Sequence, residues 1–124
     1  MQAANPVQHF SSRRLQEGSI NASLRWQFDF TDLKFSSLVI SLGTTIIAGV
    51  DSSGSGPQPG FGNQYGIDWI PNQNLVRLII FRVTFEQNGT FTCKVTAAPL
   101  AEFGAFQFES AVQVDVVGKL KVKI

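Results

Sequence analysis

The sequence LIIFRVTFEQNGTFTCKV, residues 78–95, predicts two β-strands joined by a tight corner. Residues 78–81 show the period of two that a strand requires. Asn88-Gly89 is a turn dipeptide, because both residues tolerate a positive φ. Beyond it apolar and polar residues alternate, so one face of the second strand meets a core and the other meets water. The inward set is Phe91, Cys93 and Val95, and the outward set is Thr90, Thr92 and Lys94.

Length and composition describe a single globular domain. The chain has 124 residues, 44% of them apolar and 15% charged, which is enough to bury a core. A net charge of +1 gives no basic surface for nucleic acid. The sequence has no apolar run of about 18 residues that would span a membrane, and residues 1–6 lack the features of a signal peptide. We assign residues 1–118 to the domain and residues 119–124 to an exit strand or linker.

Other alternating segments predict the remaining strands. In residues 20–30 the inward set is Ile20, Ala22, Leu24, Trp26, Phe28 and Phe30. Residues 7–15 predict a first strand, residues 35–50 a hairpin, and residues 67–71 a short strand. A loop over residues 96–105 leads into a last strand, whose inward set is Phe106, Phe108, Val112, Val114 and Val116.

Residues 51–66, DSSGSGPQPGFGNQYG, form the one low-complexity segment. Its glycines favour a flexible chain, and Pro57 and Pro59 exclude a central strand. A phosphate-binding loop would need the pattern GxxxxGK[ST] before a helix, and neither feature is present. We therefore expect a mobile surface loop.

The corner in residues 78–95 resembles the E strand, E–F corner and F strand of immunoglobulin domains, which usually end in Asp-x-Gly-x-Tyr-x-Cys. The same seven positions here read Gln87-Asn-Gly-Thr-Phe-Thr-Cys93. Gln87 cannot make the salt bridge that the family's aspartate makes to a D-strand arginine, and Phe91 lacks the hydroxyl of the corner tyrosine. The resemblance implies an all-β, immunoglobulin-like β-sandwich, with strand B in residues 20–30 and strands C and C′ in residues 35–50.

Trp26 falls where the family has its B-strand cysteine. The separation of Trp26 from Cys93, 93 − 26 = 67 residues, resembles variable-type spacing. Cys93 is the only cysteine, so the inter-sheet disulfide is absent, and the C-strand tryptophan is missing near Ile40. We expect Cys93 to be a buried free thiol packed on Trp26, which fills the volume of the lost bridge. A reactive thiol would need exposure that the inward parity denies.

No group of residues predicts catalysis, a metal or a cofactor. His9 is the only histidine, Cys93 has no base or acid at motif spacing, and no His/Cys cluster has ligand spacing. Asp29 and Asp32 are better explained by a solvated loop than by an acid–base pair or a calcium site. An enzyme is therefore not expected.

Two sequons, Asn21-Ala-Ser and Asn88-Gly-Thr, lie at positions predicted to be outward or in a turn. We predict glycosylation at Asn21 and Asn88. Together with the immunoglobulin resemblance, the sequons indicate an extracellular protein. Any membrane anchor would lie outside this sequence, which we expect to be a soluble ectodomain fragment with an added initiator Met.

The missing cysteine and tryptophan and the corner Phe91 together resemble the membrane-distal domains of the allorecognition receptors of colonial hydroids. That resemblance implies homophilic binding to the same protein on an opposing cell, which discriminates self from non-self. It implies no nucleic acid, no small-molecule substrate and no cofactor. A heterophilic adhesion or immune-type receptor domain, and a purely structural domain of a larger protein, remain open.

We predict that the partner binds the sheet of strands G, F, C and C′. Its outward residues are Ser41, Thr92, Lys94, Gln107, Glu109 and Gln113. This surface is mixed in sign and free of sequons, and a pairing of Lys94 with Glu109 across a two-fold axis would suit an isologous contact. The alternative is that these are ordinary solvent-facing strand residues.

Overall fold

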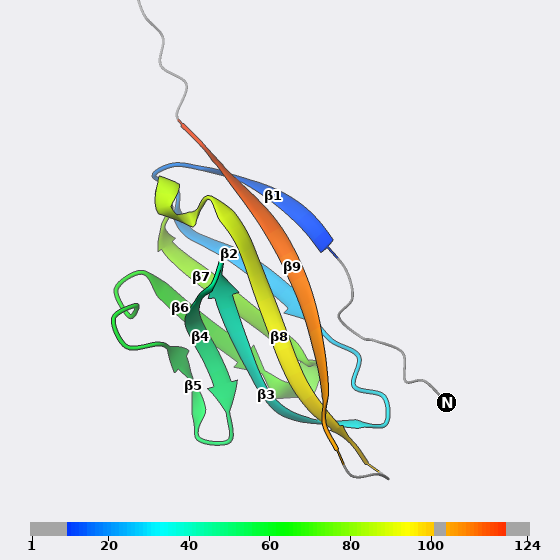
Figure 1. Cartoon of the computed structure of the whole chain (residues 1–124). Helices are drawn as coiled ribbons and strands as arrows, with labels where there is room; N and C mark the ends of the chain where they lie inside the picture. Colours follow the sequence, from blue (N-terminus) through cyan, green and yellow to red (C-terminus); the bar gives the residue numbers. More distant parts are fainter. Residues whose placement is uncertain (1–9, 101–103, 119–124) are drawn as a thin grey trace, which may run out of the picture.

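The computed structural model describes residues 10–100 and 104–118. Within these ranges the chain forms nine β-strands and two short 3₁₀ helices (Figure 1). The strands are β1 (Phe10–Gln16), β2 (Ile20–Gln27), β3 (Leu33–Leu42), β4 (Thr45–Asp51), β5 (Gly54–Pro57), β6 (Tyr65–Ile70), β7 (Leu75–Arg82), β8 (Gly89–Pro99) and β9 (Phe106–Val117); the 3₁₀ helices are η1 (Pro71–Gln73) and η2 (Phe85–Gln87). Residues 7–9 of the predicted first strand, with His9, and the predicted exit segment 119–124 lie outside the described residues.

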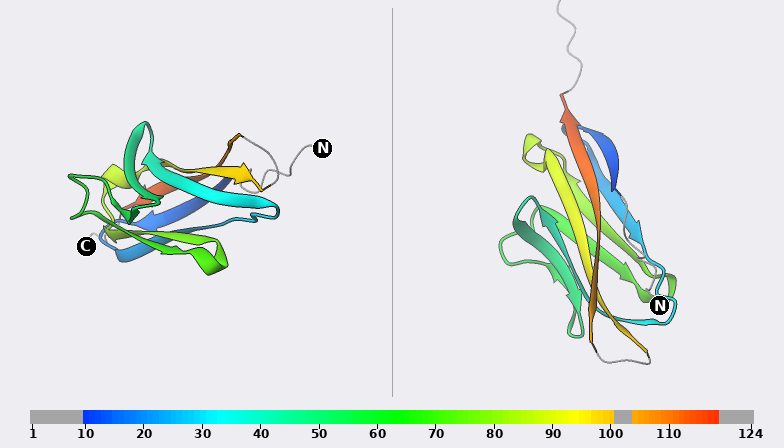
Figure 2. Two further views of the ribbon diagram at one scale, coloured as in Figure 1. Left: turned by 90° about the horizontal axis from the view of Figure 1, so that it is seen from below. Right: turned by 45° about the vertical axis from the view of Figure 1, so that its right-hand side comes forward.

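The strands form two sheets that pack face to face (Figures 1 and 2). The larger sheet has the order β1-β9-β8-β3-β4-β5 and the smaller one β2-β7-β6. Paired strands are antiparallel except β1 and β9, which run parallel. Strands β4 and β5 extend the larger sheet as C′ and C″ do in variable-type immunoglobulin domains, so β2 to β9 correspond to strands B to G. The predicted fold class is confirmed.

The core lies between the two sheets and is built from the alternating inward residues. Leu24, Trp26 and Phe28 from β2 belong to one hydrophobic cluster with residues of both sheets. Tyr65 and Phe91 are, with Trp26, the largest fully buried side chains. Beyond Phe28 a series of aromatic contacts continues through Phe30 and Phe35 to Trp69, with ring centroids 5.7, 5.9 and 4.7 Å apart.

Gln87 holds the corner between β7 and β8 and is 2% exposed. Its Oε1 accepts hydrogen bonds from the backbone N–H of Thr84 at 2.7 Å and from the Thr84 hydroxyl at 3.1 Å. Its Nε2 donates to the hydroxyl of Tyr65, at the start of β6, at 3.2 Å. The Tyr65 ring lies edge-on to Phe91, with centroids 6.5 Å apart. A tyrosine of strand D therefore supplies the hydroxyl that Phe91 lacks, and Gln87 links the corner to that strand without a salt bridge.

The expectation of a mobile loop over residues 51–66 is wrong at both ends. Gly54–Pro57 form the edge strand β5, which pairs with β4, and Tyr65 begins β6 with a buried side chain. Gln58 donates its N–H to the carbonyl of Ile47 at 2.9 Å, so the preceding residue, Pro57, faces the free edge, where its missing N–H breaks no pairing. Composition alone misses this strand, because β4 supplies the partner that orders it.

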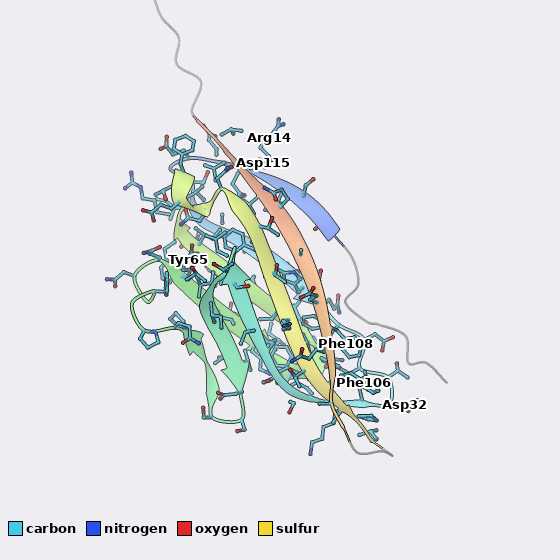
Figure 3. All side chains as sticks on the ribbon, viewed as in Figure 1. Arg14, Asp32, Tyr65, Phe106, Phe108 and Asp115 are labelled. Carbon is cyan, nitrogen blue, oxygen red and sulfur yellow. The ribbon has the colours of Figure 1, made fainter. Side chains whose placement is uncertain are left out.

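Two side chains predicted to point inward are exposed. Ile20 is 73% exposed, because Asn21 adopts a left-handed backbone with φ 57° that breaks the alternation at this end of β2. Phe106 is 42% exposed at the first residue of β9, with its ring 6.2 Å from the buried Phe108 (Figure 3). Alternation of apolar and polar residues therefore predicts burial less well at the ends of strands.

Two predicted boundaries also differ. Strand β8 continues to Pro99 and pairs with the start of β3, so the connection to β9 is shorter than residues 96–105. The corner before β8 is made by η2, and Asn88 has φ −71°, so Asn88-Gly89 does not use a positive φ at both residues. The hydrogen bonds that Thr84 donates to the Gln87 side chain explain this geometry, because they close the corner at Gln87, one residue before Asn88.

Candidate functional site: the outer face of the six-stranded sheet

The solvent side of the six-stranded sheet, here called the outer face, collects all six residues predicted to bind a partner. Ser41 lies on β3, Thr92 and Lys94 on β8, and Gln107, Glu109 and Gln113 on β9. Lys94, Gln107 and Glu109 are exposed and the other three are half-buried, whereas the residues between them are mostly buried in the core. Their role in binding stays a prediction.

Five residues of the outer face lie on one row that crosses five neighbouring strands. The row is Glu109 (β9), Lys94 (β8), Val39 (β3), Gly49 (β4) and Gly56 (β5), each a direct Cα partner of the next. Long charged side chains stand at one end of the row, and no side chains at the other. We call the Lys94–Glu109 pair the ridge.

The glycine end of this row is the floor of a groove, which we call the trough. Its volume is about 510 Å³, and its lining includes Ser37, Val39, Gly49, Asp51, Gly56 and Gln58. A Cβ built on Gly56 would meet no atom within 4 Å, whereas one on Gly49 would lie 3.2 Å from the carbonyl oxygen of Leu38. The trough exists because β4 and β5 carry glycine where outward side chains would otherwise stand.

The two charges of the ridge lie side by side within one domain. Lys94 and Glu109 are cross-strand partners and both are exposed, and such opposite charges attract by about 0.2–1 kcal/mol. Among the residues that the structure describes, the one ion pair within 4 Å is Arg77–Asp68, at 2.6 Å on the other sheet. The predicted Lys94–Glu109 contact between two copies therefore competes with the same pairing inside each copy.

Asp51 is the charged group of the trough. Its Oδ1 accepts a hydrogen bond from the Ser53 N–H at 2.8 Å and another from the Ser53 hydroxyl, in the turn between β4 and β5. These bonds hold the pKa of the Asp51 carboxyl below its usual value, so it is ionised at neutral pH. Asp51 and the glycine floor were not among the residues predicted to bind a partner. The available signal was glycine at alternate positions, Gly54 and Gly56, in a segment predicted to be a loop.

Both sequon asparagines lie away from the ridge and the trough. Asn21 is exposed on β2, in the three-stranded sheet. Asn88 lies just before β8, and its Oδ1 accepts a hydrogen bond from the Val116 N–H at 2.9 Å. This bond uses the amide oxygen of Asn88 and leaves the nitrogen, which is the atom that carries a glycan.

Cys93 is a free, buried cysteine on β8, and Trp26 on β2 is 2% exposed. Both belong to the same hydrophobic cluster, and their direct contact stays a prediction. Burial raises the pKa of the Cys93 thiol far above its ordinary value, so the thiol remains protonated and unreactive. The Trp26 Nε1 has no hydrogen-bond partner among the described residues.

The described ranges contain no group of three or more His, Cys, Asp or Glu side chains arranged to hold a metal ion. Asp29 and Asp32, which were predicted to lie in a solvated loop, are both exposed. The Thr31 N–H donates to Asp29 Oδ1 at 3.0 Å, so this carboxylate stabilises its own loop. Within residues 10–100 and 104–118, no helix has the length and apolarity to cross a bilayer.

Solved structures share this fold. A structure of murine CRIg superposes with a TM-score of 0.67 at 15% identity, covering 86% of this chain and 92% of that chain. A marsupial T cell receptor superposes with a TM-score of 0.68 at 19% identity, covering 92% of this chain and 54% of that chain. No family model and no curated protein matches the chain. The chain has the fold of a variable-type immunoglobulin-like domain.

Proposed function

We propose that this domain is the recognition module of an extracellular cell-surface protein, and that its outer face binds another protein. The proposed partner is a second copy of the same protein on an opposing cell, so that binding discriminates self from non-self. The observation that carries this proposal is that Lys94 and Glu109 stand exposed side by side on the outer face, with opposite charges. A surface that carries both signs can be complementary to a copy of itself.

Glycans at Asn21 and Asn88 are part of the proposal. Asn21 is exposed on the three-stranded sheet, and Asn88 lies at the corner that precedes β8. A bulky glycan at either position would cover surface away from the ridge and the trough, and would leave the outer face open to a protein partner. Binding would then use the outer face, and the glycans would cover the three-stranded sheet and the corner before β8.

Homophilic binding is favoured over the alternatives by the charge of the outer face. Lys94 and Glu109 place opposite signs side by side, so a like surface can be complementary to it, whereas a face of one sign would repel its copy. A heterophilic receptor domain would bind an unlike partner and leave the isolated chain monomeric. A purely structural domain would bind neither a copy of itself nor an unlike partner.

Aggregation of coated beads, together with the solution mass of the chain at high concentration, tests the proposal. Beads that carry the chain should aggregate with one another. Lys94→Glu should weaken this aggregation, whereas the matched reversal Arg25→Glu, on the exposed side of the three-stranded sheet, should not. Mixing Lys94→Glu beads with Glu109→Lys beads should restore it in part.

The double variant Lys94→Glu with Glu109→Lys tests the contact between copies more specifically than either single reversal. It keeps opposite charges side by side within the domain. Aggregation that both single reversals leave unchanged would place the binding surface elsewhere, on the β1–β2 side or the loop tips. A wild-type chain that neither aggregates beads nor self-associates at millimolar concentration would contradict homophily.

A further inference from the structure

The ridge and the trough lie on opposite sides of β3, on the same row. Strands β8 and β9 flank β3 on one side and β4 and β5 on the other. Neighbouring strands are about 4.8 Å apart, so Lys94 and Gly49 lie about 5 Å to either side of Val39, and Glu109 and Gly56 about 10 Å. The outer face therefore has a protrusion and a hollow placed symmetrically about β3.

A two-fold axis that exchanges two positions on one row must cross that row at a right angle, midway between them. On the face of a sheet, such an axis runs parallel to the strands. An axis along β3 brings the ridge of each copy over the trough of the other, with Lys94 above Gly49 and Glu109 above Gly56. Both halves of this contact form at once, as an isologous interface requires.

From this symmetry we propose that the outer face pairs with a second copy of the chain in a parallel, side-by-side arrangement, with the ridge of each copy in the trough of the other. The proposal rests on the proposed homophilic function and names the geometry and the regulation of the same face. The two copies point the same way, as neighbours on one cell surface do. A copy engaged in this pair is not available to a copy on an opposing cell.

The chemistry of the trough complements the ridge. Asp51 lies two residues along β4 from Gly49, about 7 Å away, which is within reach of the ammonium of a Lys94 side chain above Gly49. The Glu109 carboxylate would stand over Gly56, beside the amide of Gln58, and both of these residues line the trough. Each charge of the ridge thus meets an opposite charge or a hydrogen-bond donor.

An exposed apolar residue on the next row supports the same pairing. Ile46 on β4 is 48% exposed, and both Ile46 and Thr92 are Cα partners of Ser41 on β3. The axis along β3 places Ile46 of each copy against Thr92 of the other, which covers its apolar surface. Five strands by about 25 Å of strand length give roughly 600 Å² of flat area, close to the ~800 Å² per partner of a standard interface.

Sedimentation equilibrium of the unglycosylated chain tests the contact. Gly56→Gln fills the trough, and the domain itself accommodates the new side chain, because a Cβ at Gly56 meets nothing within 4 Å. It should weaken self-association by about tenfold or more through steric exclusion. The matched control Ser23→Gln adds the same side chain on the three-stranded sheet and should leave self-association unchanged. Lys94→Gln and Asp51→Asn should each weaken pairing about two- to fivefold, less so at high salt.

The orientation is tested by the distance between spin labels on a Gly118→Cys variant, since the buried Cys93 takes up no label. The parallel pair predicts about 20 Å between the two labelled backbones, whereas an antiparallel pair centred on the ridge predicts about 60 Å. A long distance, or a Gly56→Gln chain that pairs as well as wild type, overturns the side-by-side pair even if beads still aggregate. Failure of the beads to aggregate overturns binding between opposing cells and leaves the solution dimer standing.

Discussion

The hydrogen bond from Gln87 to Tyr65 should contribute strongly to stability, because it links the corner before β8 to the core. Replacing Tyr65 with Phe removes one hydroxyl and leaves the Nε2 of the buried Gln87 without its partner, which is 3.2 Å away in the wild type. A lost hydrogen bond with one buried polar group left unpaired should lower the free energy of unfolding by about 1–2 kcal/mol. Gln87→Ala removes three such bonds and should cost about 3 kcal/mol.

Urea unfolding followed by tryptophan fluorescence measures these changes. The double variant should show a coupling of about 1 kcal/mol, because Tyr65→Phe has little left to remove once Gln87 is Ala. Ser52→Ala, on the exposed β4–β5 turn, is a control for loss of a hydroxyl and should stay within about 0.5 kcal/mol of wild type. A Tyr65→Phe variant as stable as this control, or strictly additive costs, would refute this role of the hydrogen bond.

Four further outcomes are expected. Trp26→Ala should cost about 3–5 kcal/mol in a urea titration, as a large truncation in the core, and a cost below 1 kcal/mol would show that the ring is not packed. Cys93 should resist thiol reagents in the native state, and rapid labelling would contradict its burial. Because burial raises the folded-state pKa of this thiol, stability should hold below its ordinary pKa near 9 and fall as pH rises above it, less steeply in Cys93→Ala. Deleting residues 52–56 removes most of β5 and should cost about 2 kcal/mol in its hydrogen bonds to β4, whereas a loop deletion would barely shift the melting midpoint.

The faces of the strands could be predicted from the sequence, because alternation is a local property of each strand. Leu24, Trp26 and Phe28 are buried as their parity predicts, and Lys94 and Glu109 are exposed. The prediction fails at Ile20, where the left-handed Asn21 interrupts the alternation. It also fails at the ends of strands, where the opposite sheet no longer covers every inward position.

Contacts between distant residues could not be predicted in this way. The opposition of Lys94 and Glu109 depends on the register of β8 against β9, which no single strand reveals. Gln87 and Tyr65 are 22 positions apart and are joined by the packing of the corner against β6. The trough could not be predicted from the sequence, because glycine disfavours strands. Gly56 becomes part of a strand only through its pairing with β4.

A glycan placed on the outer face tests most directly whether that face is the recognition surface. The pair Gln107→Asn with Glu109→Thr creates a sequon at two exposed, outward positions of β9, and Arg25→Asn with Gln27→Thr creates a matched one on β2. Both proteins would be made in glycosylating cells, with occupancy checked by mass, and assayed by bead aggregation. The outer-face glycan should abolish aggregation and the β2 glycan should not. Undiminished aggregation with a fully occupied glycan at position 107 would contradict the assignment of the outer face.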